Sequence, residues 1–252
     1  MEPVQYHASA GVARITLQRP EKRNALNPES IAALRRALAH AAKQEDVKIV
    51  LLAGAGRDFC AGLDLKALDE ASGSGVMGHL ESARQFGDLI LDLRRHPHPV
   101  IAAVQGRALA GGAGIATASD MILASESASF GYPEVKIGFV PAIVAALLRR
   151  SVGEKRAFEL LAAGNSISAR DAHSLGLVNH VFPDGEFEQS VDSYVVSFAG
   201  RSASALSLLK DVLYQTDGVT LEKAVEAAVH TNALARMTED AQRGFEKFAK
   251  KN

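Results

Sequence analysis

The chain has a single cysteine among its 252 residues, Cys60, and it lacks a surplus of charge of either sign. One cysteine excludes an internal disulfide and a cysteine-rich zinc site, and such scarcity is typical of a reducing compartment, so we predict a cytoplasmic protein with no bound metal. The 28 Lys and Arg residues nearly balance the 29 Asp and Glu residues, and they are scattered. Nucleic acid is therefore not an expected partner.

Long apolar runs are also missing. The longest lies near residues 140–148, contains Pro141, and is about half as long as a membrane span requires. The first residues, Met1 to Val4, have neither a basic start nor an apolar stretch of signal-peptide length. We expect neither membrane insertion nor export. With 47% hydrophobic residues, the chain can bury a full core, either as one large domain or as a domain with an appendage.

Strand and helix patterns alternate over the first three quarters of the chain. Short segments on either side of Gly11 predict a hairpin, and Asn27 followed by Pro28 predicts the start of a helix that runs to about residue 44. Further strands are predicted at 49–53, 100–104, 121–124 and 128–130. This alternation indicates the α/β class.

The last quarter of the sequence has helical patterns throughout. We therefore predict a core at 1–198 and a helical segment at 199–252. The expected helices span residues 202–214, 221–236 and 238–250, the last capped by Thr238. Earlier in the chain, residues 69–78 are rich in Ser, Gly and acids, which predicts a mobile loop before a helix at 80–95. Asp64 is the expected N-cap of a short segment at 65–68.

Two glycine-containing segments, 58–64 and 108–114, each follow a predicted strand, and Glu134 lies twenty residues after the second. Backbone N–H groups from two such segments can form an oxyanion hole. Such a hole stabilises the negative charge that a thioester carbonyl gains when its α-carbon is deprotonated or its conjugated alkene is attacked. Without a Cβ, Gly111 and Gly112 would let that oxygen approach the amides at the start of a helix. The spacing therefore predicts catalysis.

Five segments in collinear order resemble the enoyl-CoA hydratase/isomerase (crotonase) superfamily. They are RPEKRNALN at 19–27, FCAGLDL at 59–65, PVIAAVQG at 99–106, GG at 111–112 and PE at 133–134. The resemblance implies a crotonase-like spiral of ββα units with a C-terminal helical trimerisation segment. It also implies a homotrimer or a hexamer made of two trimers. An acyl-CoA would be the substrate, with coenzyme A part of that substrate and no separate cofactor.

The resemblance also assigns roles to individual residues. It gives the hole to the backbone N–H groups of Leu63 and Gly111, and acid/base chemistry to Glu134, whose pKa burial should raise. The substrate-binding residues that it implies are Lys22, Ala25, Ala61, Asp64, Leu65, Lys66, Gly112, Gly114 and Pro133. Near the C-terminus, Phe248 and Lys251 resemble residues that reach an acyl-CoA site of a neighbouring subunit, although Phe248 could equally pack on its own core.

Gly114 departs from the pattern of the two-glutamate hydratases, which carry a second carboxylate at the matching position. The chain thus resembles a single-glutamate branch, and hydration of a 2-enoyl-CoA to a 3-hydroxyacyl-CoA is the first prediction. Two alternatives stay open: Δ3,Δ2-enoyl-CoA isomerisation with Glu134 as the sole proton shuttle, and a non-catalytic acyl-CoA-binding subunit. A dinucleotide fingerprint is rejected because Thr117 stands where its third glycine belongs.

Overall fold

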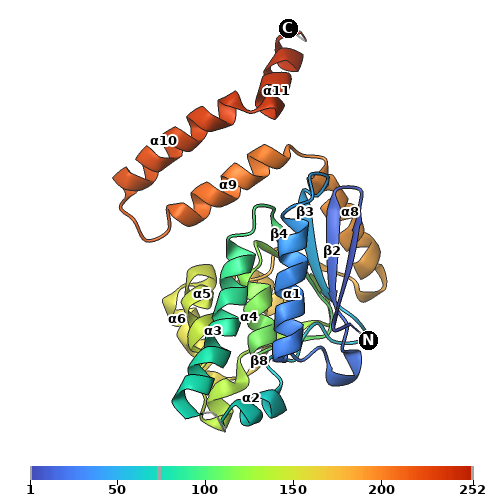
Figure 1. Ribbon diagram of the computed structural model, residues 1–252, viewed down its shortest axis with the longest axis vertical. Coiled ribbons are helices and arrows are strands. Elements are labelled where there is room, and N and C mark those ends of the chain that lie inside the picture. The colour runs from blue at the N-terminus through green and yellow to red at the C-terminus, as the bar shows by residue number, and fades with distance from the viewer. Residues whose placement is uncertain (1, 73–74, 251–252) are drawn as a thin grey trace.

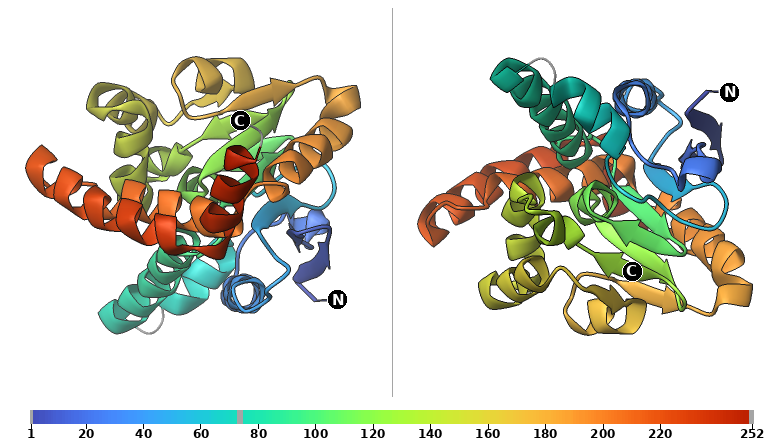
Figure 2. Two further views of the ribbon diagram at one scale, coloured as in Figure 1. Left: turned by 90° about the horizontal axis from the view of Figure 1, so that it is seen from above. Right: turned by 90° about the horizontal axis from the view of Figure 1, so that it is seen from below.

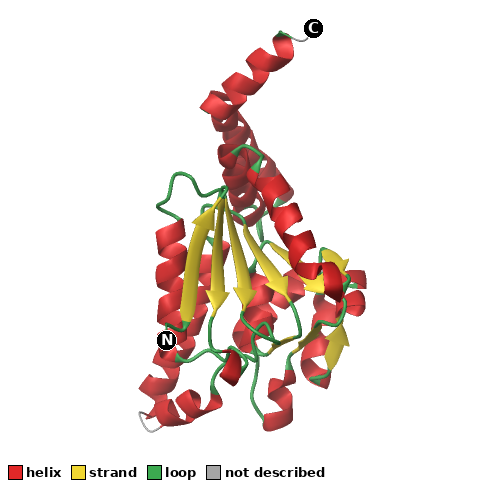
Figure 3. Cartoon of the chain, turned by 90° about the vertical axis from the view of Figure 1, so that its right-hand side faces the viewer, coloured by secondary structure: helices red, strands yellow, loops and turns green. Residues whose placement is uncertain are grey.

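The computed structural model describes residues 2–72 and 75–250, and it has a mixed α/β architecture built around one large sheet (Figures 1 and 3). The sheet has the strand order β1-β2-β3-β4-β6-β9, in which only the β1–β2 pair is antiparallel. Its strands are β1 (Val4–Ser9), β2 (Val12–Leu17), β3 (Ile49–Gly54), β4 (Val100–Val104), β6 (Met121–Ser125) and β9 (His180–Phe182). The predicted α/β class and the predicted hairpin are confirmed.

A second, three-stranded sheet has the order β5-β7-β8 and lies beyond the carboxyl ends of the first. Its strands are β5 (Arg107–Leu109), β7 (Ser129–Gly131) and β8 (Ser166–Ser168). The prediction missed β5, β8 and β9, because a strand of three residues is too short to show an alternating pattern. This small sheet matters for function because β5 and β7 lead directly into the elements that carry Gly111 and Glu134.

Helices cover both faces of the large sheet, so its central strands are apolar at nearly every position. The helices of the core are α1 (Pro28–Ala41), α2 (Leu65–Ser72), α3 (Gly75–Arg94), α4 (Gly111–Ala118), α5 (Ala142–Val152), α6 (Glu154–Ala163), α7 (Ala169–Ser174) and α8 (Phe187–Ala199). Three 3₁₀ turns join them: η1 (Pro20–Lys22), η2 (Pro133–Ile137) and η3 (Asp184–Glu186). Helix α8 packs on one face, while α1, α3 and α4 pack on the other (Figure 1).

The region predicted as a mobile loop, 69–78, is helical wherever it is described. Helix α2 runs to Ser72 and α3 begins at Gly75, while residues 73 and 74 lie outside the described residues. The N-cap prediction is confirmed, because the Lys66 N–H donates to Asp64 Oδ1 at 3.2 Å. The loop prediction was wrong because it relied on the local content of Ser and Gly. Helix α2 is instead stabilised by packing against α3.

The C-terminal helices project from the core and lie over one end of it (Figures 1 and 2). They are α9 (Ala203–Gln215), α10 (Leu221–Met237) and α11 (Glu239–Ala249), with Thr238 capping α11 as predicted. Phe245 and Phe248 are exposed, so they do not pack on the core of their own chain, and Lys251 lies outside the described residues. The domain boundary predicted between residues 198 and 199 stays a prediction.

Lys210 is the buried residue by which α9 is anchored to the core, since its side chain is only 5% exposed. Its ammonium group lies 2.8 Å from Asp120 Oδ2 and donates to the carbonyl oxygen of Leu93 at 3.0 Å. The Tyr214 hydroxyl also donates to Asp120. Because burial disfavours the charged form, it lowers the pKa of Lys210, and the Asp120 carboxylate opposes that shift. An ion pair thus ties the projecting helices to the core.

We expect Lys210→Ala to lower the free energy of unfolding by about 3 kcal/mol, because removing one partner of a buried ion pair leaves the other charge unpaired. Urea denaturation followed by circular dichroism measures the change. Lys223→Ala on the exposed face of α10 is the matched control and should alter stability by less than about 0.5 kcal/mol. Equal effects of the two substitutions would contradict the anchoring role.

Candidate active site

The two segments predicted to form the hole lie side by side. The Leu109 N–H donates to the Cys60 carbonyl oxygen at 2.9 Å, and Cys60 and Ala108 form a parallel bridge. Beyond this bridge the segments stay in contact, because a β-carbon placed on Gly62 would lie 3.2 Å from the amide nitrogen of Gly111. The structure therefore brings Leu63, the next residue, beside the start of α4.

The other edge of the first segment is paired with residues 23–26. The Leu26 N–H donates to the Gly62 carbonyl oxygen, and the Asp64 N–H donates to the Leu26 carbonyl oxygen, both at 2.8 Å. Among the described residues, neither the Leu63 amide nor the Gly111 amide donates a backbone hydrogen bond. Gly111 is the first residue of α4, where helix geometry leaves N–H groups without an intrahelical partner. Both amides are free to donate to a ligand.

Helix α4 begins at a tightly constrained turn. Ala110, which precedes it, has φ 50° and ψ −125°, a backbone conformation that residues with a β-carbon rarely adopt. A β-carbon on Gly112 would lie 2.8 Å from the Cys60 carbonyl carbon and closer still to its oxygen, so only glycine fits there. All eight residues of α4 are buried, so the positive end of its dipole acts in a weakly polar setting.

Glu134 is held close to this turn by the second sheet. The Ala110 N–H donates to the Gly131 carbonyl oxygen at 2.8 Å, and Glu134 follows three residues later in η2. The residue is 8% exposed, and its Oε2 atom has no hydrogen-bond partner among the described residues. Burial raises the pKa of Glu134, as predicted. A buried carboxylate oxygen without a partner is uncommon in proteins, and it marks a group able to exchange a proton with a ligand.

Apolar side chains fill the position where a second carboxylate would stand. A β-carbon on Gly114 would lie 2.7 Å from Val144 Cγ2 and 3.3 Å from Phe86 Cζ. Phe86 comes from α3 and Val144 from α5, and neither was among the predicted site residues. The helical spacing of buried residues in α3 signals only that Phe86 faces inward.

The predicted binding residues fall into three groups by their exposure. Lys22, Leu65 and Lys66 are exposed, whereas Ala25, Ala61, Asp64 and Pro133 are half-buried and Gly112 and Gly114 are buried. Asp64 also forms an ion pair with Arg19, with 3.3 Å between Oδ2 and Nη2. A cavity of about 210 Å³ lies beside Leu63 between α1, α2 and α3, and its lining includes Leu26, Ile31, Leu68, Glu81 and Gln85. Of the predicted residues, Leu63 and Asp64 line this cavity.

Cys60 and His96, which are both buried, are structural. The Cys60 thiol donates to the Asn24 carbonyl oxygen at 3.1 Å, and burial raises the pKa of the thiol to about 12, so it stays protonated. Both ring nitrogens of His96 lie 3.1 Å from backbone carbonyl oxygens, those of Leu38 and His98. Within residues 2–72 and 75–250, no group of His, Cys, Asp or Glu is arranged to hold a metal ion.

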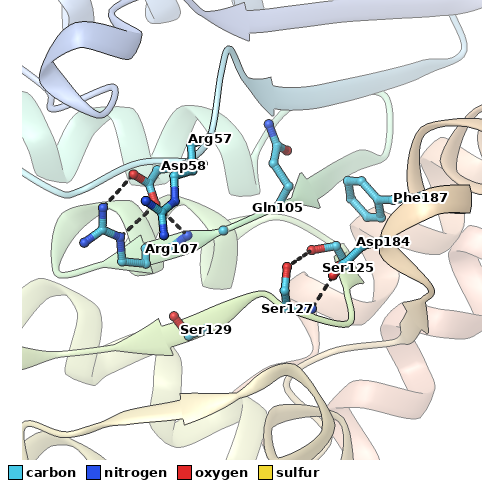
Figure 4. Close-up of a pocket in the computed structure, with 10 residues that line it drawn as sticks. Arg57, Asp58, Gln105, Arg107, Ser125, Ser127, Ser129, Asp184 and Phe187 are labelled. Carbon is cyan, nitrogen blue, oxygen red and sulfur yellow. Dashed lines mark hydrogen bonds and ion pairs between the residues drawn. The ribbon is translucent and has the colours of Figure 1, made fainter.

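A second cavity, of about 490 Å³, is polar and lies at the carboxyl ends of β3, β4, β6 and β9 (Figure 4). None of the predicted site residues lines it. On its wall, Arg107 donates two side-chain hydrogen bonds of 2.8 Å to Asp58, and its backbone N–H donates a third at 3.1 Å. These bonds hold the pKa of Asp58 below its usual value. The pair fixes the register between the two segments that carry Leu63 and Gly111.

Comparisons with known proteins show what the chain is similar to. The sequence profile described as Enoyl-CoA hydratase/isomerase matches residues 7–252. A Thermus thermophilus protein named as a candidate enoyl-CoA hydratase is 38% identical over 240 residues, which cover 95% of each chain. The 1,2-epoxyphenylacetyl-CoA isomerase of Escherichia coli is 32% identical and covers 100% of this chain and 97% of its own.

A solved structure of a similar protein has the same fold. The crystal structure of an enoyl-CoA hydratase from Mycobacterium smegmatis superimposes with a TM-score of 0.95 at 31% identity, covering 100% of this chain and 98% of that one. No helix in the described part of the chain is long and apolar enough to span a membrane. The profile match over nearly the whole chain, together with these relatives, shows that the protein belongs to the enoyl-CoA hydratase/isomerase (crotonase) superfamily.

Proposed function

We propose that the protein adds water to a 2-enoyl-CoA and releases a 3-hydroxyacyl-CoA, with Glu134 as its single acid/base group. The observation that carries the proposal is the buried, unpartnered Oε2 of Glu134, three residues beyond the hydrogen bond that ties Gly131 to the turn before α4. The free amides of Leu63 and Gly111 would bind the thioester oxygen.

In this reaction Glu134 accepts a proton from water while the water oxygen bonds to C3 of the substrate. The electron pair of the C2=C3 double bond shifts toward the thioester, so that its oxygen becomes an enolate oxygen held by the two amides. Each such donor contributes roughly 2.7–4 kcal/mol of transition-state stabilisation. The protonated Glu134 then delivers its proton to C2, the carbonyl re-forms, and the carboxylate returns to its starting state.

The raised pKa of Glu134 suits both halves of this cycle. A carboxyl group of raised pKa is a stronger base toward water and still gives up its proton to the enolate. The exposed Lys22 and Lys66 would contact the phosphates of coenzyme A, while Ala25, Ala61, Leu65 and Pro133 would line the path of the ligand. Asp64 would act through its contacts with Arg19 and α2.

Isomerisation of a 3-enoyl-CoA to a 2-enoyl-CoA is a second candidate, and the apolar surroundings of Gly114 favour it. With Phe86 and Val144 at that position, no second carboxylate is available there to orient water. Moving the double bond needs only one base, which removes a proton from C2 and returns one to C4. The name of the Escherichia coli relative also describes an isomerase, although of another substrate.

Two assays separate these functions. Loss of the conjugated thioester absorbance of crotonyl-CoA reports hydration, and gain of that absorbance from a 3-enoyl-CoA reports isomerisation. Exchange of the α-protons of butyryl-CoA in deuterated water reports enolate formation in either case. We expect hydration together with exchange. Exchange without hydration would replace the hydratase proposal by the isomerase, and the absence of every reaction would leave an acyl-CoA-binding subunit.

The exposed apolar residues of α9–α11 support the predicted homotrimer or hexamer. Leu221, Val229, Leu234, Met237 and Phe248 are each more than half exposed, which is unusual for so many large apolar side chains on neighbouring helices. Light scattering coupled to size-exclusion chromatography measures the mass of the assembly. A 26.7 kDa particle would show that this surface stays uncovered.

A further inference from the structure

We propose that Phe86 and Val144 form the wall that limits the size of the acyl group, so that the site selects compact, apolar acyl chains. This inference rests on the proposed acyl-CoA function and adds the substrate class. It concerns two residues of α3 and α5 that the sequence motifs did not include.

The ring of Phe86 lies against both glycines that face the site from α4. Its Cζ atom would be 3.3 Å from a β-carbon placed on Gly111 and 3.3 Å from one placed on Gly114. These glycines are three residues apart, so they lie on the same face of the helix, one turn from each other. The ring thus covers the face of α4 between Gly111 and Gly114.

Val144 and Leu63 complete the wall on either side of the ring. The Cγ2 atom of Val144 would lie 2.7 Å from a β-carbon on Gly114, and the Cγ atom of Leu63 would lie 3.3 Å from one on Gly111. The side chains nearest to these two glycines, Leu63, Phe86 and Val144, are therefore all apolar. An acyl chain bound with its carbonyl oxygen at Gly111 and extending along this surface would meet the ring within a few carbons.

The wall is firmly packed. Phe86 is 3% exposed and Val144 is 2% exposed, and both belong to the main hydrophobic core. Helix α4 contacts both α3 and α5. A ring packed on several sides cannot swing into solvent to admit a longer chain, because closely packed interiors resist such rearrangement. An acyl group with a charged end in this direction would lose its hydration without gaining a partner.

The test compares acyl chains of four to ten carbons in the wild-type protein and in Phe86→Ala. The readouts are kcat/KM for the 2-enoyl-CoA series and calorimetric binding of butyryl-, hexanoyl-, octanoyl- and decanoyl-CoA. We expect the wild type to prefer the four-carbon chain. The preference for eight carbons over four should rise at least tenfold in Phe86→Ala, since one methylene in an apolar pocket changes kcat/KM roughly 10–200-fold.

Leu89→Ala is the matched control, because Leu89 lies one turn further along the same helix and is equally buried, but it is not among the atoms nearest to Gly111 or Gly114. It should leave the chain-length ratio at the wild-type value. Val144→Ala should shift the ratio in the same direction as Phe86→Ala. If Phe86→Ala fails to fold, Phe86→Leu takes its place in the same measurements. A ratio in Phe86→Ala equal to that in Leu89→Ala would overturn the inference, as would a wild type that binds decanoyl-CoA as tightly as butyryl-CoA. Because binding is measured with saturated acyl-CoA, a protein without turnover would refute the proposed reaction but still test the wall.

Discussion

Glu134→Gln should lower kcat by about 10²- to 10⁴-fold while acyl-CoA binding stays close to that of the wild type. Glutamine has nearly the same shape as glutamate but cannot accept or release a proton, and general acid–base catalysis contributes a factor of this size. The hole amides of Leu63 and Gly111 are untouched by the change. Steady-state kinetics with crotonyl-CoA and calorimetry with butyryl-CoA measure the two effects separately.

The pH profile gives this prediction a second readout. Glu134 must be ionised to act as a base, so kcat/KM of the wild type should fall as the pH drops through its pKa. Because burial raises that pKa, the fall should begin at a higher pH than for an ordinary glutamate. The residual activity of Glu134→Gln should lack this acidic limb. Glu126→Gln, an exposed surface change, is the control and should behave as wild type. Full turnover in Glu134→Gln would contradict the assignment of Glu134 as the acid/base group.

The sequence carried enough local information to predict the elements that hold the site. Asn27 and Pro28 start α1 because the asparagine side chain accepts a hydrogen bond from the Ser30 amide and proline suits the first helical turn. The glycines at 111 and 112 were recognisable because they come shortly after the apolar strand predicted at 100–104. Fully apolar runs such as 49–54 signal strands buried on both faces.

Contacts between distant segments could not be predicted in the same way. Whether Phe86 faces the core or the site depends on how α3 crosses α4, and its sequence spacing is the same in both cases. The three-residue strands β5 and β8 exist because their neighbours supply hydrogen bonds, not because of their own side chains. The contact of Gly112 with the Cys60 carbonyl likewise joins residues 52 positions apart. Tertiary packing therefore determines the orientation of Phe86, the formation of the short strands and the contact of Gly112 with Cys60.

Gly112→Ala is expected to lower kcat/KM by about 10²- to 10³-fold and to destabilise the fold. The new β-carbon would overlap the backbone carbonyl of Cys60, and neither backbone can move without breaking the bridge between the two segments. Separating them would displace the Leu63 amide from the Gly111 amide. Loss of one hole donor removes about 2.7–4 kcal/mol of transition-state stabilisation, which corresponds to that fall in rate.

Gly185→Ala tells this steric effect apart from a general cost of replacing glycine. Gly185 has no heavy atom within 4 Å of the position of a β-carbon, and its backbone conformation is open to alanine. Activity and unfolding free energy should both stay at wild-type values in this control. In Gly112→Ala the loss of activity should persist at temperatures where circular dichroism still shows a folded protein. The geometry of the oxyanion hole is lost in this variant even while the core remains folded. A folded Gly112→Ala protein with wild-type kcat/KM would show that the two segments need not be in contact for catalysis.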